Sequence, residues 1–391
     1  MKSNWITATI DDVCTVVTDG AHNSPKSVEQ GHYMASVKDF TEFGFDFSNC
    51  KQIGEEDYKK LRNQGCVPEK NDILVGKDGA RYFEDIIIYK QDERPALLSS
   101  IAILRADCRK ITPEFLYYTL KSPAVRKDVR DNYGSGSAIP RIVLKDFKRM
   151  PFSFPSIEEQ RKITNLCSAI DAKIQINNAI NENLEQQAKA LYQQMFIENT
   201  CPDWIEGSLR DIADITMGQS PSGSSYNEDG IGTIFFQGRA EFSFRFPTIR
   251  LYTTEPKRMA YANDILMSVR APVGDLNIAH TDCCIGRGLA AIHSKTNHQS
   301  FVLYTMFSLR KQLDVFNGEG TVFGSINRNS LNDMPILIPS DETIEEFEKI
   351  VAPMDAAIRN NYDEICRLQA VRDSLLPRLM SGELDVSSLD I

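Results

Sequence analysis

One stretch of this chain occurs twice, and each occurrence opens a long helical pattern. Residues 150–155 read MPFSFP and lead into SIEEQRKI, and residues 334–339 read MPILIP and lead into SDETIEEFEKI. At an offset of 184 positions, and without a gap, residues 150–195 and 334–379 share eleven identities in 46 positions. The chain is therefore expected to fold as two related halves rather than as one continuous domain.

Both copies continue as a stripe of mostly apolar residues in alternating steps of 4 and 3, the spacing that favours a coiled-coil partner. The stripe positions that we expect in a coiled coil are Ile163, Ile170, Ile174, Asn181, Leu184 and Leu191 in the first copy, and Met354, Ile358, Asn361, Leu368, Leu375 and Leu379 in the second. Each stripe is roughly 50 Å long at about 1.5 Å per residue. A neighbouring globular domain does not cover a helix of that length, so we expect the two helices to pair with each other.

Antiparallel pairing is expected, because it places the end of the first helix beside the start of the second. The domain between them then enters and leaves at one point, as compact domains do. In this register Asn181 and Asn361 face each other and fix the alignment, at some cost in stability. The alternative is that the two amphipathic helices pack separately on their own domains.

The rest of the chain predicts two α+β domains of similar fold. Short β-branched runs at Ile86–Tyr89, Ile101–Leu104 and Ile336–Ile338 are mixed with helical stretches such as Pro113–Lys121. The run NDILV at Asn71–Val75 resembles NDILM at Asn263–Met267. The expected organisation is a first globular domain, a first long helix, a second globular domain and a second long helix with a tail, at residues 1–155, 156–200, 201–340 and 341–391.

The net charge of −10 lies almost entirely on the helical segments, since residues 156–199 carry −2 and residues 341–391 carry −7. The two globular parts are close to neutral and can each present a basic face to nucleic acid. The nine cysteines include no CxxC pair, and no signal peptide is recognisable. No apolar run approaches the roughly 18 residues of a membrane helix. These features predict a soluble, cytoplasmic protein with reduced thiols.

Few motifs point to catalysis. The sharpest lead is FNGEG at Phe316–Gly320, which fits the FxGxG loop that holds S-adenosylmethionine in many methyltransferases. Such a loop should follow a buried strand, whereas here it follows the helical-looking SLRKQLDV. No GxxxxGK[ST] phosphate loop, no GxSxG elbow and no metal-ligand spacing occurs, although a nuclease carboxylate set stays open. We therefore expect that this chain has no catalytic, cofactor-binding or metal site and that its role is to position another molecule.

Loop residues at matching places in the two copies suggest which kind of molecule the chain binds. Arginine and lysine grip phosphates or guanine edges, and asparagine and glutamine read adenine. The residues that we expect to contact DNA are His22, Asn23, Lys77, Arg81, Arg141 and Lys145 in the first copy, and Gln219, Ser220, Arg270, Asn327 and Arg328 in the second. The plainer interpretation of any one of them is a solvated loop residue; recurrence in both copies favours the group.

Over nearly its whole length, the chain resembles the specificity subunits of type I restriction–modification systems. The resemblance is carried by MPFSFPSIEEQRKI followed by ALYQQMFIE, and by MPILIP followed by LLPRLMSGELDV at 375–386. It implies two variable target-recognition domains that each read one half of a bipartite DNA site. It also implies an antiparallel pair of helices that sets the gap between the halves and docks two modification subunits.

The resemblance further implies that this chain has no catalytic centre. S-adenosylmethionine, ATP and Mg²⁺ are then expected on the partner modification and restriction subunits, which methylate adenine at N6 and cut DNA. One departure is that the second copy lacks a counterpart of Gln160–Arg161. Two other hypotheses stay open: a methyltransferase that uses FNGEG, and an adaptor whose coiled coil spaces two protein-binding domains. The DNA sequence that is read and the gap length do not follow from the sequence.

Overall fold

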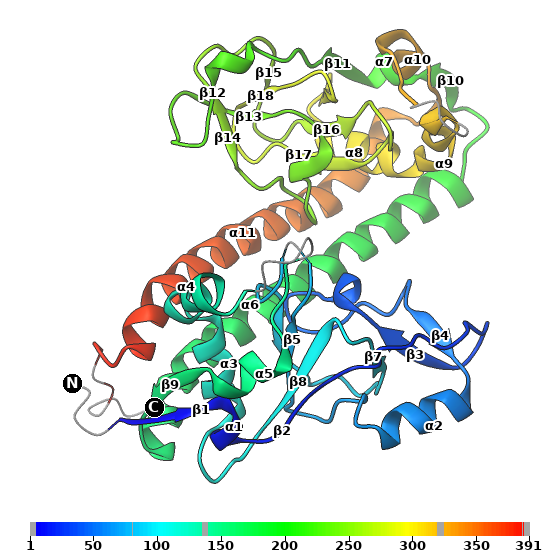
Figure 1. Ribbon diagram of the computed structural model, residues 1–391. Helices are drawn as coiled ribbons and strands as arrows, with labels where there is room; N and C mark the ends of the chain where they lie inside the picture. The colour runs from blue at the N-terminus through cyan, green and yellow to red at the C-terminus, as the bar shows by residue number, and fades with distance from the viewer. Residues whose placement is uncertain (1–4, 80, 135–139, 319–323, 385, 387–391) are drawn as a thin grey trace. The chain divides into compact units, whose positions relative to one another are not determined.

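Two long helices dominate the structure, a computed structural model that describes residues 5–79, 81–134, 140–318, 324–384 and 386 (Figure 1). They are α6 (Ile157–Tyr192), which continues as a π-helix over Gln193–Glu198, and α11 (Asp341–Met380). The chain divides into two compact units, Met1–Asn178 with Asp363–Ile391, and Ala179–Tyr362. Each long helix therefore contributes one half to each unit.

The globular part of the first unit combines strands with short helices. Its elements in chain order are β1 (Ile6–Thr9), α1 (Ile10–Val13), β2 (Cys14–Asp19), β3 (His32–Ala35), η1 (Val37–Asp39), β4 (Lys51–Ile53), α2 (Glu55–Asn63), β5 (Ile73–Gly76), β6 (Ile86–Ile88), β7 (Ala96–Leu97), β8 (Ile101–Ala106), α3 (Pro113–Lys121), α4 (Pro123–Asn132), α5 (Leu144–Arg149) and β9 (Pro151–Phe154).

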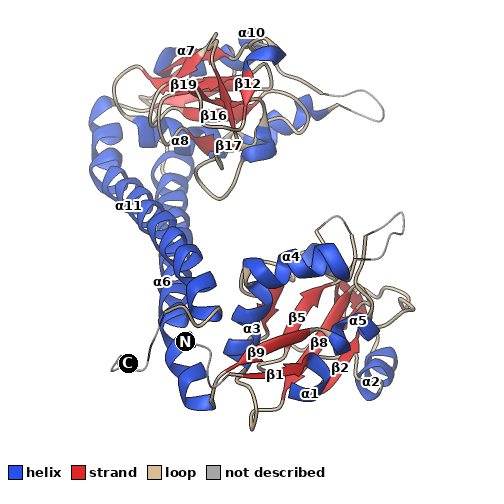
Figure 2. Cartoon of the chain, turned by 60° about the vertical axis from the view of Figure 1, so that its left-hand side comes forward, coloured by secondary structure: helices blue, strands red, loops and turns tan. Residues whose placement is uncertain are grey.

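The core sheet of the first unit has the strand order β2-β8-β5-β6 and is antiparallel throughout. A second sheet has the order β4-β3-β7, and β1 pairs with β9 as a separate ribbon. Helix α3 lies along the core sheet (Figure 2). It begins at Pro113 because Thr112 accepts a hydrogen bond from the Phe115 amide, and because proline fits the first helical position. Phe115 and Leu116 are then buried against Ile73 and Leu104.

The globular part of the second unit has a similar order of elements, in which a short strand takes the place of α2 and one strand is added before the counterpart of β3. Its elements are β10 (Ile205–Ser208), α7 (Leu209–Ile212), β11 (Ala213–Met217), η3 (Gly223–Ser225), β12 (Tyr226–Asn227), β13 (Thr233–Phe236), η4 (Arg239–Glu241), β14 (Leu251–Thr253), β15 (Met259–Ala260), β16 (Ile265–Ser268), β17 (Leu276–Ile278), β18 (Cys283–Ile285), β19 (Leu289–Ser294), α8 (Gln299–Ser308), α9 (Arg310–Leu313), η5 (Asp314–Asn317), α10 (Arg328–Asn332) and β20 (Pro335–Ile338).

The second unit repeats the sheets of the first and adds one strand at each edge of the second sheet. Its core sheet has the order β11-β19-β16-β17, with α8 packed on it as α3 is packed in the first unit. The second sheet has the order β12-β14-β13-β18-β15, in which the parallel pair β13–β18 matches β3–β7. The ribbon β10–β20 matches β1–β9. The duplication inferred from the sequence therefore extends through both globular domains.

The halves of α6 and α11 pair antiparallel within each unit. In the first unit, Ile170 and Ile174 pack with Ile365, and the Asn177 amide donates to Glu364 Oε2 at 2.8 Å. In the second unit, Asn361 Nδ2 donates to Asn181 Oδ1 at 2.8 Å. The residue numbers rise along α6 as they fall along α11, which is the antiparallel order. The expected fold class, two similar α+β domains with an antiparallel coiled coil, is confirmed.

The predicted coiled-coil positions are buried or half-buried throughout. They face the globular domains as well as the partner helix, since Ile163 and Leu379 join the core of the first domain and Ile358 joins that of the second. The two arrangements weighed from the sequence are therefore combined, because one stripe serves both contacts. Within the described part of the chain, no helix is both long and apolar enough to cross a membrane.

Candidate nucleic-acid interface

Four backbone segments meet at one end of the core sheet in the second unit. Three of them follow β11, β13 and β16 and comprise residues 218–220, 237–239 and 269–271, respectively. The fourth comprises residues 286–288 and connects β18 to β19. Strand register brings them together, since Met217 pairs with Ala290 and Ser268 pairs with Leu289. We call this group the second loop cluster.

Backbone hydrogen bonds connect the four segments directly. The Gly286 amide donates to Phe236 O at 2.8 Å, and the Gln219 amide donates to Ile285 O at 3.0 Å. The Val269 amide donates to Gly288 O at 2.9 Å. A Cβ atom at Gly218 would lie 2.1 Å from Gly286 O, so only glycine permits this approach. The cluster is therefore a bonded platform rather than a set of independent loops.

The first unit builds the same platform from residues 20–22, 35–37, 77–79 and 98–100, the first loop cluster. The Leu98 amide donates to Ala35 O at 2.9 Å, as Gly286 does to Phe236, and the Lys77 amide donates to Ser100 O at 2.8 Å, as Val269 does to Gly288. A Cβ atom at Gly20 would lie 2.2 Å from Leu97 O. The two clusters thus share their backbone contacts and their obligatory glycine.

The predicted DNA-contacting residues of the first copy take different places. His22 belongs to the first loop cluster and Asn23 follows it; both are exposed and line a cleft that α2 closes. Lys77 is 7% exposed and forms ion pairs with Asp19 at 3.3 Å and Asp78 at 3.7 Å. Its ammonium group therefore lies under the platform instead of facing outward.

The remaining predicted residues of the first copy lie near the same end. Arg141 is exposed, and its backbone forms a β-bridge with Asp78, next to the first loop cluster. Lys145 is exposed on α5. Arg81 is exposed but pairs with Asp85 at 2.7 Å, which offsets its charge.

In the second copy, the structure gathers three of the five predicted residues in the second loop cluster. Gln219, Ser220 and Arg270 belong to it, and Gln219 and Arg270 are exposed. Asn327 caps α10, since its Oδ1 accepts from the Ser330 amide at 3.0 Å, and Arg328 is the exposed first residue of that helix. Asn327 therefore has a structural use for the oxygen that was expected to read DNA.

Two cluster residues were missed from the sequence. Gln237 and Arg287 are both exposed and sit on the segments that follow β13 and β18. Neither belongs to a stretch that repeats between the two halves. The signal that could have found Arg287 is its place between Gly286 and Gly288, a Gly-Arg-Gly turn that holds one long side chain between two residues without any.

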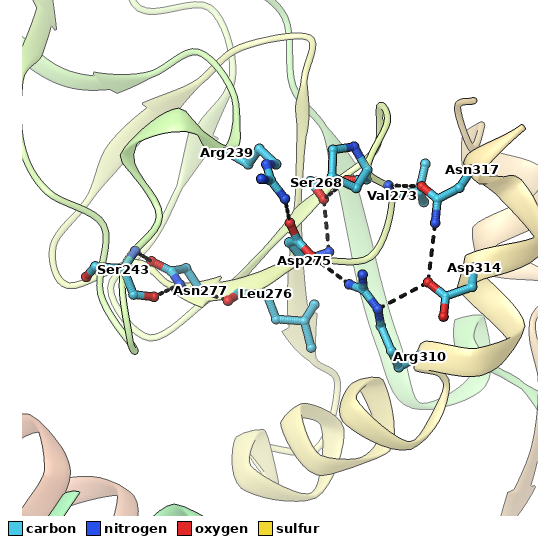
Figure 3. A network of polar contacts seen from close by, with 11 residues as sticks. Arg239, Ser243, Ser268, Val273, Asp275, Leu276, Asn277, Arg310, Asp314 and Asn317 are labelled. Carbon is cyan, nitrogen blue, oxygen red and sulfur yellow. Dashed lines mark hydrogen bonds and ion pairs between the residues drawn. The ribbon is translucent and has the colours of Figure 1, made fainter. Parts of the chain in front are cut away.

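A polar network supports the turn that carries Arg270 (Figure 3). Ser268 Oγ donates to Pro272 O at 2.7 Å and accepts from the Asp275 amide at 2.9 Å. The Val273 amide donates to Asn317 Oδ1 at 2.6 Å. These bonds fix the path of the chain on both sides of the turn, and they give Asn317, part of the FNGEG stretch, a bracing role.

Asp275 neutralises the cations beside this network. Its carboxylate pairs with Arg239 and, at 2.7 Å, with Arg310 (Figure 3). All three residues line an open cavity of about 700 Å³ on the second unit, together with Lys189 and Tyr304. Arg239, although exposed in the second loop cluster, is therefore already paired.

The structural context of FNGEG differs from that of a cofactor loop. Its described start belongs to the short helix η5, which directly follows α9 and not a strand. Residues 319–320 lie outside the described residues. Across the described ranges, no group of three or more His, Cys, Asp or Glu side chains could hold a metal ion.

Comparisons with known proteins agree with this geometry. The model of the type I restriction modification DNA specificity domain matches residues 2–186 and 202–365. The "Putative type I restriction enzyme MjaX specificity subunit" of Methanocaldococcus jannaschii is 28% identical over 99% of this chain and 95% of its own. The type I restriction enzyme HindI specificity subunit of Haemophilus influenzae is 21% identical over 87% of this chain and 90% of its own.

The fold is also found in a solved structure. The S subunit of a type I restriction-modification system from M. genitalium superposes with a TM-score of 0.57, at 18% identity, over 96% of both chains. With two matched copies of the family domain, each bearing one loop cluster, this chain belongs to the family of type I restriction modification DNA specificity proteins.

Proposed function

We propose that this chain is the DNA-sequence specificity subunit of a type I restriction–modification complex, in which each globular domain reads one half of a bipartite site. The observation that carries the proposal is the duplicated loop cluster. Both units build the same backbone platform, yet they place different side chains on it. Two readers on one scaffold suit a recognition sequence with two unlike halves.

In this proposal the paired helices α6 and α11 set the gap between the half-sites and dock two modification subunits. Their acidic surface suits protein contacts better than DNA contacts, because phosphates repel carboxylates. The near-neutral domains imply weak binding by the chain alone, with the partners supplying much of the phosphate contact. The chain itself does no chemistry: S-adenosylmethionine, ATP and Mg²⁺ belong to the modification and restriction subunits.

The experiment that tests the proposal is a map of adenine methylation in host DNA, by single-molecule sequencing, with this gene intact and deleted. Loss of methyl groups from a two-part motif on deletion is the expected result. The matched control restores the gene on a plasmid together with its modification subunit, which should restore the motif. A modification subunit that methylates the same motif without this chain would overturn the proposal.

A second experiment isolates the role of the helices. Insertion of one heptad into residues 177–184 of α6, with a matching heptad in the facing part of α11, should change the gap while both half-site sequences stay the same. The facing insertion keeps the stripes aligned, which one-sided lengthening would not. Loss of one half-site from the methylation motif would contradict a spacing role.

A further inference from the structure

We propose that the Gly286–Gly288 turn and the adjoining turn at 269–271 form a guanine-reading site in the second domain, with Arg287 as the base-contacting residue and Arg270 beside it. The proposal rests on the proposed function and specifies one of its half-sites. It predicts that the half-site read by the second domain contains a guanine, and that Arg287 selects it.

Both guanidinium groups are exposed and uncommitted. No hydrogen bond or ion pair joins the side chain of Arg270 or Arg287 to any other residue that the structure describes. Arg258 and Arg328 are likewise exposed and without a side-chain partner among the described residues, but neither lies in the second loop cluster, whose remaining arginine, Arg239, pairs with Asp275. An arginine with all its donors free can form the two parallel bonds to O6 and N7 that identify guanine in the major groove.

The backbone under both arginines is fixed. The Arg287 amide donates to Ser220 Oγ at 3.2 Å, and the Leu289 amide donates back to Gly286 O at 3.0 Å, which closes the turn. The Val269 amide donates to Gly288 O at 2.9 Å and joins the two turns. A preorganised base-contacting residue loses less conformational freedom on binding than a residue on a mobile loop.

Glycines on both sides of Arg287 are required by the platform. A Cβ atom at either Gly286 or Gly288 would lie 2.8 Å from Gln237 O, closer than real Cβ contacts. The turn therefore lies flat on the segment that carries Gln237 and projects a single long side chain. Gln219 and Gln237 flank that side chain and are exposed, so they suit an adjoining adenine.

The first domain lacks this chemistry at the matching places. Ser99 occupies the position of Arg287, because Leu98 and Ser100 make the backbone bonds that Gly286 and Gly288 make. Asp78 occupies the position of Arg270, since both form the β-bridge to the loop before α5 or α10. A hydroxyl and a carboxylate cannot make a guanidinium-type contact, so these two positions of the first domain do not read guanine in this way, and the assignment concerns the second half-site alone.

The test uses the full chain co-expressed with its modification subunit, comparing wild type with Arg287→Ala, Arg287→Lys, Arg270→Ala and Ser99→Ala. The readout is the methylation motif, followed by binding to duplexes in which each guanine of the second half-site is replaced in turn by 7-deazaguanine. That base lacks N7 but keeps its pairing. One such replacement should weaken wild-type binding by roughly five- to 140-fold and leave the Arg287→Ala complex unaffected.

The expected motif for Arg287→Ala has one relaxed position in the second half-site and an unchanged first half-site. Ser99→Ala is the matched control and should leave the second half-site intact. Uniform weakening across all sequences, with the salt slope reduced by about 1, would show a phosphate contact and overturn the proposal. A second half-site without guanine would also overturn it. Absence of any bipartite motif in wild type would instead refute the proposed function itself.

Discussion

In both units an aspartate at the same position of the repeated helix connects the helix to the domain, but the cation that pairs with it comes from a different part of the chain. In the first unit, Asp171 on α6 accepts from Tyr118 Oη at 2.6 Å and pairs with Arg372 of α11 at 2.8 Å. In the second unit, Asp355 on α11 accepts from Tyr304 Oη at 3.0 Å and pairs with Arg245, which comes from the globular domain.

The sequence repeat shows which residues of this contact occupy the same position in both units and which do not. Asp171 and Asp355 are 184 positions apart, so they are the same residue of the duplicated helix. The position that matches Arg372 on α6 is Ala188, which is fully buried in the second core. The duplicated scaffold therefore requires the acid, its tyrosine and a cation, but it does not require that the cation come from the helix.

A similar exchange occurs where each long helix meets the amino end of a domain helix. In the first unit the buried Gln160 of α6 accepts from the Thr112 amide at 2.9 Å, just before α3. In the second unit Glu348 of α11 accepts from the Ser300 and Phe301 amides at 3.2 and 3.1 Å, at the start of α8. The missing counterpart of Gln160 is thus replaced by an acid one helical turn further along, and the amides that need acceptors are satisfied in both copies.

The largest difference between the units should appear on removal of the two arginines. Arg245 faces both Glu185, at 3.1 Å, and Asp355, and its own side chain is 3% exposed. Burial alone would lower the pKa of Arg245, but Asp355, Tyr304 and Glu185 raise it overall. Arg245→Ala leaves Asp355 without a cation and Glu185 with Lys189 alone, at 2.5 Å, and should lower the free energy of unfolding of the second unit by about 3–5 kcal/mol.

Arg372→Ala is the matched change in the first unit and should cost less, roughly 1.5–3 kcal/mol. Asp171 keeps its bond from Tyr118, as Asp355 keeps that from Tyr304, but the other partner of Arg372, Glu42, has a side chain that is 39% exposed and can be hydrated, whereas that of Glu185 is 9% exposed. Hydrogen–deuterium exchange of α3 and α8 reports on the two units separately. Lys349→Ala, in an exposed pair, should change neither by more than about 0.5 kcal/mol. Equal losses from both arginine variants would contradict the asymmetry.

The loop clusters should show the opposite behaviour, an equal effect in both copies. Gly20→Ala and Gly218→Ala each place a methyl group against a backbone carbonyl, at 2.2 and 2.1 Å, and should each cost about 1–3 kcal/mol. Gly223→Ala is the control, because no atom lies within 4 Å of the added Cβ. Thermal unfolding of the three variants checks this, and a neutral result at only one of the two cluster glycines would show that the platform is not shared.

Much of the fold was readable because it depends on local patterns. The heptad stripes and the shared MP…P entry predicted α6 and α11, and the helical stretch predicted over Pro113–Lys121 has the bounds of α3. The antiparallel order followed from chain geometry alone. These features depend only on residues that are close together in the sequence or on how the chain connects its elements.

The parts of the site that escaped prediction depend on contacts between distant segments. Lys77 reads as a free cation on a glycine-rich turn, but Asp19 at the end of the adjacent β2–β8 pair reaches it and keeps it buried. Arg245 lies in a loop with no motif, and only the tertiary structure brings it to Asp355. Arg287 had no repeated partner to mark it, since its counterpart is Ser99. Residues that vary between the copies are those for which repetition gives no signal.

The smallest predicted effect separates two asparagines that occupy the same position of the repeat. Asn361 donates to Asn181, which is 2% exposed, so Asn361→Leu strips a buried amide of its partner and should cost about 1–2 kcal/mol. Asn177 donates to Glu364, but its own Oδ1 has no hydrogen-bond partner among the described residues. Asn177→Leu removes that unsatisfied atom, and Glu364 keeps Lys173 at 3.4 Å, so stability should change by less than about 0.5 kcal/mol.

Denaturant unfolding of both variants, with hydrogen exchange to assign each loss to its unit, checks this last pair. The double variant Asn181→Leu/Asn361→Leu is the informative control, because it removes both polar groups and should recover the stability lost in Asn361→Leu, as apolar replacement of both partners does. If the double variant recovers stability but the helices then pair in more than one register, the Asn181–Asn361 bond has a role that Asn177 does not share: it fixes the alignment of α6 with α11. A double variant as unstable as Asn361→Leu would mean that packing at this level, and not the amide bond, holds the pair together.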